Sequence, residues 1–194
     1  SDPRGNVYPS VFERVVISAD GNTAYIAGEE GLYIVDLSDT ANPTLLGHYS
    51  DSGRHLYSVA LSENENIAYL VGSSRKLYSI DITDPVNPVL ITSINLPTEP
   101  WPPWGSTNGS ELLLSPDGAT LYVTINGSKT SEVDQGYIYS IDLNADTTLV
   151  PTVIDALKMP YGGWSAALAQ ERNAIFVAGG KSPSGHNNGF QIVN

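Results

Sequence analysis

The sequence contains no cysteine, which excludes a disulfide scaffold, a thiolate metal site and a cysteine nucleophile. It is also poor in positive charge. Nine Lys and Arg stand against 21 Asp and Glu, giving a net charge of -12 over 194 residues. Nucleic acids and anionic membrane surfaces bind clustered Lys and Arg, and no such cluster is present, so neither is expected as a partner.

Long apolar runs and catalytic motifs are missing as well. No stretch of about 18 apolar residues occurs, so no membrane insertion is expected. The sequence has no Gly-x-Ser-x-Gly elbow, P-loop or His-Glu-x-x-His motif, and it therefore predicts no catalytic residue. Hydrophobic residues make up 41% and charged residues 15%, a globular composition, with 18 Gly and 13 Pro to supply turns.

One stretch recurs along the chain. Residues 31–39 read Gly-Leu-Tyr-Ile-Val-Asp-Leu-Ser-Asp, and residues 76–84 read Lys-Leu-Tyr-Ser-Ile-Asp-Ile-Thr-Asp; an Asn-Pro pair follows each. Looser copies lie at 137–146 and 189–194. An internal repeat at this spacing indicates an array of identical structural units.

Each copy falls in a unit of short apolar strands separated by turns. The expected strands are 14–18, 23–27, 31–37 and 44–49; 57–61, 67–71, 76–82 and 89–94; 111–115, 120–124, 137–143 and 151–157; and 164–168, 174–178 and 189–194. The second strand of every unit carries an aromatic residue, at Tyr25, Tyr69, Tyr122 and Phe176. No segment has a 3.6-residue period, so almost no helix is expected.

The repeat resembles a known family. Residues 31–39 with their Asn-Pro are similar to the LVIVD repeat of bacterial and archaeal surface propellers, and residues 114–123 are similar to a blade turn of lactonase-like propellers. The resemblance implies an all-β, β-propeller fold and says little about activity. We predict a single domain, 1–194, of four four-stranded blades. Their approximate bounds are 11–50, 56–96, 110–158, and 164–194 completed by 1–10.

The fourth unit lacks its last strand. Its final copy of the repeat stops where the others continue with Ser-Asp or Thr-Asp-Pro, and the chain begins with Ser-Asp-Pro. The N-terminal segment could close the chain's own ring, complete a blade of a neighbouring copy to give an oligomer or filament, or belong to a longer propeller. The residues expected at this junction are Ser1, Asp2, Pro3, Val7, Tyr8, Ile192, Val193 and Asn194.

Long irregular connections are expected on one face of the propeller, at 51–55, 97–108, 126–135 and 179–188. Function in such folds is usually carried by loops on a rigid scaffold. Trp101 and Trp104 lie among prolines and would offer stiff aromatic surfaces for a glycan or protein, or would pack over the channel. The other candidate binding residues are Lys129 and His186. Asn108 and Asn126 match the glycosylation sequon.

Repeated acidic residues are the remaining candidates for chemistry. Asp36, Asp81 and Asp142 end the third strand of their units, where a ring of carboxylates could hold a cation such as calcium. Each also precedes a turn that an Asp side chain can cap, and this structural role is the preferred interpretation. Asp20 and Asp117, each followed by Gly, are interpreted as turn residues on the same grounds.

Three histidines, His48, His55 and His186, could in principle bind a metal, but their spacing does not require one. We therefore predict no metal site and no required cofactor. The predicted function is a non-enzymatic extracellular or surface module, with a periplasmic location as the alternative, that binds a protein or glycan. Closure of the chain's own ring by the N-terminal segment is the preferred arrangement, and self-assembly by N-terminal strand donation is its rival. The rival hypothesis is a lactonase-like, metal-dependent hydrolase with its site in the central channel.

Overall fold

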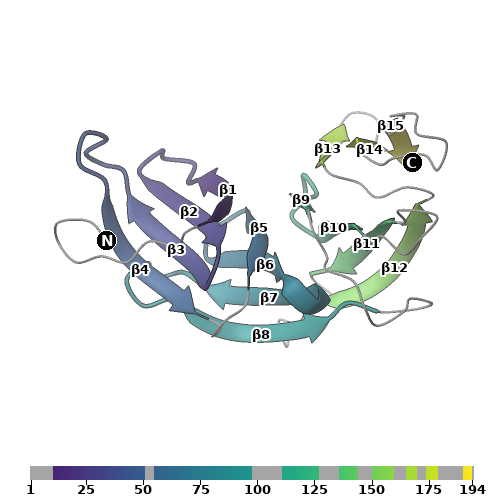
Figure 1. Ribbon diagram of the computed structural model, residues 1–194, viewed down its shortest axis with the longest axis horizontal. Helices are drawn as coiled ribbons and strands as arrows, with labels where there is room; N and C mark the ends of the chain where they lie inside the picture. Colours follow the sequence, from purple (N-terminus) through teal and green to yellow (C-terminus); the bar gives the residue numbers. More distant parts are fainter. Residues whose placement is uncertain are drawn as a thin grey trace.

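A computed structural model describes residues 11–50, 55–97, 111–126, 136–143, 150–159, 165–169, 174–178 and 190–193. These residues form β strands and tight turns, and their one helical element is a short 3-10 helix, η1 (Ser73–Arg75). The strands make four antiparallel sheets that follow one another along an arc (Figure 1). The sequence prediction of an almost helix-free β-propeller is confirmed.

Each sheet is a meander in which consecutive strands pair. Sheet A comprises β1 (Phe12–Ile17), β2 (Thr23–Gly28), β3 (Gly31–Asp36) and β4 (Thr44–Ser50). Sheet B comprises β5 (Leu56–Leu61), β6 (Ile67–Gly72), β7 (Lys76–Asp81) and β8 (Val89–Asn95). Sheet C comprises β9 (Glu111–Leu114), β10 (Thr120–Asn126), β11 (Gly136–Asp142) and β12 (Thr152–Met159). In sheet D the described strands are β13 (Ser165–Ala169), β14 (Ala174–Ala178) and β15 (Phe190–Val193).

The strand bounds agree with the sequence pattern to within two residues at every end. The first strand begins at Phe12 rather than Arg14, because a bulge between Phe12 and Arg14 lets the strand continue past the alternating apolar run. The first strand of sheet B has the same bulge, between Leu56 and Ser58. Bulges of this kind change the direction of side chains at a sheet edge. Because both bulges fall at the same place in their strands, β1 and β5 can be aligned residue by residue.

The turns between first and second strands show why the polar residues recur. In sheet A the Ser18 hydroxyl donates to Asp20 Oδ1 (2.6 Å), which also accepts the Asn22 N–H (2.9 Å). Gly21 takes φ = 77°, and the equivalent residues Glu65 and Gly118 also have positive φ. The second and third units repeat the arrangement with Asn64 and Asp117 in the place of Asp20. The prediction that Asp20 and Asp117 are turn residues is confirmed.

Apolar cores fill the spaces between neighbouring sheets. Between sheets A and B, Tyr25 and Ile34 pack with Leu70 and Ile80. Two further cores lie between sheets B and C and between sheets C and D. The second-strand aromatics Tyr25, Tyr69 and Tyr122 each belong to, or pack against, one of these cores. Sheets B and C are therefore covered on both faces, as expected of successive blades.

The number of blades in a complete ring and its closure by residues 1–10 remain predictions, because those residues lie outside the described part of the chain. Figure 1 shows sheets A and D at the two ends of the arc, with the first strands on its concave side and β4, β8 and β12 on its convex side. The concave side is where the sheets come closest together, and it holds the candidate site.

Candidate functional site

The first strands of all four sheets share one polar position. Val16, Ala60, Leu113 and Ala167 pair with the second-strand aromatics, and these pairs fix the alignment of the four sheets. The residue two places earlier is Arg14 in sheet A, Ser58 in sheet B, Glu111 in sheet C and Ser165 in sheet D. Residues two apart on a strand share a face, so each of these side chains leans toward the next sheet along the arc.

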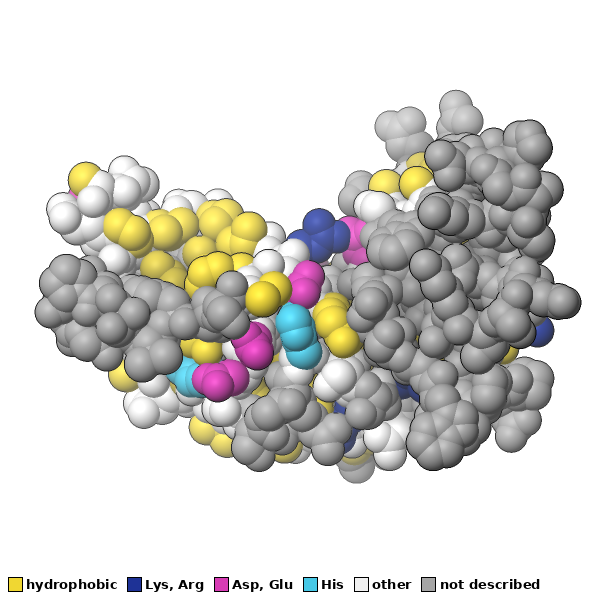
Figure 2. Space-filling model, in the orientation of Figure 1, with side chains coloured by type: hydrophobic (Ala, Val, Ile, Leu, Met, Phe, Trp, Pro, Cys, Tyr) yellow, Lys and Arg dark blue, Asp and Glu magenta, His cyan; other side chains and the backbone are white. Residues whose placement is uncertain are grey.

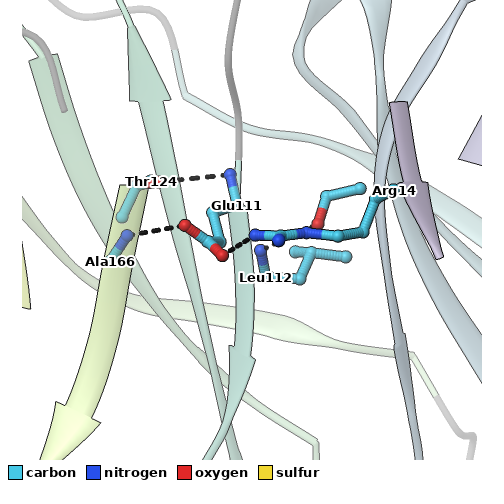
Figure 3. Close-up of polar contacts among 6 residues, drawn as sticks. Arg14, Glu111, Leu112, Thr124 and Ala166 are labelled. Atoms are coloured by element: carbon cyan, nitrogen blue, oxygen red, sulfur yellow. Dashed lines mark hydrogen bonds and ion pairs between the residues drawn. The ribbon is translucent and has the colours of Figure 1, made fainter. Parts of the chain in front are cut away.

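At two of these positions the side chain bonds to the next blade. The Leu112 N–H of sheet C donates to Ser58 Oγ of sheet B (3.2 Å). In the same way, the Ala166 N–H of sheet D donates to Glu111 Oε2 of sheet C (2.6 Å). Leu112 and Ala166 occupy equivalent positions, so the contact is a repeated bridge between blades (Figure 3).

Arg14 cannot accept a backbone N–H from the next blade in this way, because a guanidinium has no hydrogen-bond acceptor. It extends instead to Glu111 and forms an ion pair with Oε1. Glu111 is thereby held through both carboxylate oxygens, one by the Arg14 side chain of sheet A and one by the backbone of sheet D. Its own N–H donates to Thr124 Oγ1 (3.2 Å). We refer to Arg14, Ser58 and Glu111 as the inner polar cluster.

The inner polar cluster contains a buried carboxylate, Glu111, whose removal from water costs free energy. Glu111 is only 7% exposed, whereas the Arg14 side chain keeps 41% of its surface in solvent. A buried carboxylate is tolerated when its oxygens are paired and hydrogen-bonded, as they are here.

A second group of charged and aromatic side chains adjoins this cluster. His55 Nε2 lies 2.8 Å from Glu13 Oε1, and the His55 ring stacks on Tyr57 with centroids 5.0 Å apart and planes 19° apart. Figure 2 shows acidic, basic and histidine side chains gathered in the middle of the concave side, with apolar side chains over the sheet A end. We call Glu13, Arg14, His55 and Tyr57 the concave surface.

Repeated acidic residues elsewhere have structural roles. Asp36 Oδ1 accepts the Ser38 N–H (2.8 Å), and Asp81 Oδ1 accepts both the N–H and the hydroxyl of Thr83 (2.9 and 2.7 Å). Asp39 and Asp84 bond in the same way to the Asn residues of the Asn-Pro pairs. The interpretation of Asp36 and Asp81 as caps, rather than members of a cation ring, is supported by these bonds.

These hydrogen bonds have a consequence for pH. Side-chain and backbone donors stabilise the charged form and lower the pKa of each capping carboxyl below its ordinary value of 3.8. A lowered folded-state pKa adds stability that is present above the ordinary value and is lost as the pH falls through the folded value. The capping carboxylates therefore contribute fully to folding stability at neutral pH, and this contribution is lost when they are protonated in acid.

Most of the binding residues predicted from the sequence lie outside the described residues. These are Trp101, Trp104, Lys129, His186 and Asn108, together with the junction residues Ser1, Asp2, Pro3, Val7, Tyr8 and Asn194. Asn126 is the last residue of β10, and Ile192 and Val193 lie on β15, paired with Phe176 and Ile175 of β14. Their proposed roles remain predictions.

Within the described ranges, no group of three or more His, Asp or Glu residues is placed to hold a metal ion. No helix in that same part of the chain has the length and apolar character needed to cross a membrane. Of the two described histidines, His48 stacks on Tyr33 (4.2 Å) in the outer half of sheet A, and His55 belongs to the concave surface.

Sequence reasoning missed the inner polar cluster. The signal was a single polar residue at the same place in otherwise apolar first strands, as in Arg14-Val-Val-Ile and Glu111-Leu-Leu-Leu. The predicted strands at 14–18 and 111–115 both begin at this polar residue. Alignment of the first strands on the second-strand aromatics places Arg14, Ser58 and Glu111 at one position.

Comparison with known protein families identifies the repeat. The LVIVD repeat family matches residues 15–51 and 53–96, which correspond to sheets A and B. A comparison with curated proteins finds no match.

Solved structures share the fold at low sequence identity. Similar structures include a periplasmic gluconolactonase of Pseudomonas aeruginosa (14% identity, TM-score 0.67) and a protein from Lactobacillus plantarum (15%, 0.66). A third is the β-propeller domain of Cps50 (Swd1) from Myceliophteria thermophila (13%, 0.63). These matches cover 94%, 94% and 89% of this chain, but only 53%, 56% and 51% of the other chains.

The chain thus spans about half the length of the propellers it matches, and at such identities the likeness establishes the fold alone. The repeat match and the four consecutive antiparallel sheets agree with each other. The chain is a β-propeller protein whose first two blades are LVIVD repeats.

Proposed function

We propose that the chain is a non-enzymatic binding module that acts outside the cytoplasm and recognises a protein or a glycan. The observation that carries this proposal is the make-up of the concave surface. The His55–Tyr57 stack lies beside the Glu13 carboxylate, and Arg14, the next residue along β1, keeps 41% of its side chain exposed. Aromatic faces with flanking charged donors and acceptors suit sugar rings and peptide side chains alike.

The contacts between blades support this role because they make the concave surface rigid before a ligand binds. Glu111 fixes Arg14 from one side, and the bridges from Ser58 and Glu111 tie neighbouring blades together. A preformed surface loses less conformational freedom on binding. The predicted loop residues Trp101, Trp104, Lys129 and His186 would extend the same recognition surface, with Asn108 and Asn126 as glycan acceptors. The acidic residues of the described turns stabilise those turns and are not proposed to contact the ligand.

The test is binding to an array of neutral and acidic oligosaccharides and to extracellular proteins, followed by calorimetry on any partner found. Tyr57→Ala and Arg14→Ala should each weaken binding of that partner at least tenfold, about 1.4 kcal/mol. Trp101→Ala with Trp104→Ala tests the loop contribution. Thr92→Ala, on a strand of the convex side, is the matched control and should bind like the unaltered chain. Equal binding by all variants would contradict the proposal.

The rival enzyme hypothesis has a separate assay. Its support is the similarity of fold to a gluconolactonase, and it would place a cation such as calcium in the central channel. Lactone hydrolysis that appears on adding calcium, and that is lost in Glu111→Gln, would favour it over the binding module. Glu111→Gln keeps an oxygen for the Ala166 N–H and so preserves the bridge.

Self-assembly by strand donation is a second candidate. Sheet D has three described strands where the other sheets have four. An open sheet edge can accept a strand from another chain. Deleting residues 1–10 should abolish assembly if the N-terminal segment is the donated strand, and native mass measurements before and after the deletion decide this.

A further inference from the structure

The turns at one end of sheets A, B and C are acidic. Consecutive strands of a meander run in opposite directions, so the turn after the first strand and the turn after the third strand lie at the same end of the sheet. We call this end the turn side. Its described turns are 18–22, 37–43, 62–66, 82–88 and 115–119, and every charged residue in them is acidic: Asp20, Asp39, Glu63, Glu65, Asp84 and Asp117.

Contacts between sheets join these turns into one surface. The Ala19 N–H of sheet A donates to Glu65 Oε1 of sheet B (2.6 Å). A Cβ at Gly118 of sheet C would lie 3.4 Å from Glu63 Oε2 of sheet B. The acidic turns of three successive sheets therefore lie side by side.

The basic residues in the described part of the chain lie elsewhere. Arg14 forms its ion pair with Glu111 on the concave side. Arg75 and Lys76 connect β6 to β7 at the opposite end of sheet B, and Lys158 lies near the opposite end of sheet C. Because no described cation neutralises the turn side, its negative potential extends into solvent.

Three exposed apolar side chains lie among the acidic residues of sheet B. Val86, Val89 and Leu90 are 55%, 60% and 41% exposed, and they fall within five consecutive residues at the start of β8 and in the turn before it. Val89 pairs with Asp81, so these apolar residues adjoin the acidic end of β7. We call Val86, Val89 and Leu90 the apolar patch.

The fold does not need valine at these places. Sheet A builds the same turn with Ala41 and Thr44 where sheet B has Val86 and Val89. In both sheets the N–H of the Ala41 or Val86 position donates to the Asp side chain two residues earlier (3.0 Å in each case). Exposed apolar side chains rimmed by charged residues are typical of a protein-binding surface.

The turn that carries the apolar patch is held firmly. Its Pro85 and Val86 carbonyl oxygens pack on Gly47 of β4, where a Cβ would come within 2.2 and 2.9 Å of them. The side-chain amide of Asn87 donates to Asp84 Oδ2 (2.8 Å). A surface that is already formed loses less conformational freedom on binding.

We propose that the turn side of sheet B is a second binding surface, which takes a Lys- or Arg-rich segment of another protein that also carries apolar side chains. The apolar side chains of that segment cover the apolar patch, and its cations meet the carboxylates of the flanking turns. Charge complementarity selects this partner, because an acidic segment would be repelled and a neutral one would leave the carboxylates unpaired. The proposal does not rest on ligand binding at the concave surface, which lies on other residues.

The test is calorimetry of the full chain with three short synthetic peptides, in which Lys alternates with Val, Glu with Val, or Lys with Ser. The unaltered chain should bind the Lys–Val peptide at least tenfold more tightly than either of the others, because only this peptide matches both the charge and the apolar patch. Added salt should weaken that binding, since exposed charges are screened.

Variants locate the binding. Val86→Ala combined with Val89→Thr gives sheet B the residues that sheet A already has, so the chain should fold and should bind the Lys–Val peptide about tenfold more weakly. Leu157→Thr is the matched control, because Leu157 is also exposed (45%) but lies on β12 toward the opposite end of sheet C. Tyr57→Ala is the control for the concave surface. Both controls should bind like the unaltered chain.

Circular dichroism of every variant separates lost binding from lost folding. Absence of binding by the Lys–Val peptide would overturn the proposal, as would equal binding of the Glu–Val or Lys–Ser peptide. Binding that survives the double replacement at Val86 and Val89, or that is lost in Tyr57→Ala, would overturn it as well.

Discussion

Val15 and Val59 are the same residue at the same place in two successive repeats, yet Val15 is 53% exposed and Val59 is 2% exposed. Both strands have the same length and the same bulge, and both valines pair with the second strand of their own sheet. The difference lies in the neighbouring sheet. Sheet A covers Val59, and no described element covers Val15.

The comparison shows that the burial of a first-strand residue depends on the neighbouring blade that packs against it. A strand cannot bury both faces of its sheet alone, so a repeat unit has half of its core supplied by the preceding unit. Identical sequence positions should therefore differ in their energetic importance between sheets A and B. Four comparisons between equivalent positions test this, in order of decreasing expected effect.

The largest contrast should come from Leu56→Ala and Phe12→Ala, which occupy equivalent positions. Leu56 is fully buried, so its truncation should cost about 3 kcal/mol of unfolding free energy. Phe12 is 50% exposed, and its truncation should cost well under half as much. Urea unfolding measures both. Equal losses would show that Phe12 is packed as closely as Leu56.

A smaller contrast is expected from exchanging Gly47 and Thr92, which align in the fourth strands of sheets A and B. A Cβ at Gly47 would collide with the carbonyl oxygen of Pro85, in the turn of the next sheet. Gly47→Thr should therefore cost about 2 kcal/mol, as overpacking does. Thr92→Gly should cost less, about 1 kcal/mol, through backbone freedom. Chemical denaturation of both variants would detect a reversed order, which would contradict the alignment.

The inner polar cluster gives the next contrast. Ser58→Ala removes the acceptor of the Leu112 N–H at a fully buried position and should cost about 1 kcal/mol. Ser165→Ala, at the equivalent but exposed position in sheet D, should have no effect on the isolated chain. Hydrogen exchange at the Leu112 amide is the direct measurement. An unchanged exchange rate in Ser58→Ala would mean that the bridge contributes nothing.

The smallest effect concerns pH and His48, whose counterpart in sheet B is Ser93. Desolvation of the ring face stacked on Tyr33 lowers the pKa of His48 below its ordinary value of 6.5. Stability from the neutral ring is present above that value and is lost as the pH falls through the lower folded value. His48→Ser should remove this part of the pH dependence, which thermal melts between pH 7 and pH 5 would show.

The sequence predicted the fold well because the information was local and repeated. Turn residues such as Asp20, apolar alternation and the second-strand aromatics each specify a blade without reference to distant residues. The inner polar cluster needed more. Arg14 and Glu111 are 97 positions apart in the sequence, and only the curvature of the arc brings them together. The difference in burial between Val15 and Val59 could not be predicted either, since the two residues look alike in the sequence.

The most direct test of the central claim, that the neighbouring sheet supplies the burial of Val59, uses the absence of cysteine. Val15→Cys and Val59→Cys each introduce a unique thiol, and its rate of maleimide labelling reports its exposure. The account predicts rapid labelling of Val15→Cys and strong protection of Val59→Cys in the folded chain, because Val15 is 53% exposed and Val59 is 2% exposed. Equally fast labelling of the two variants would contradict it.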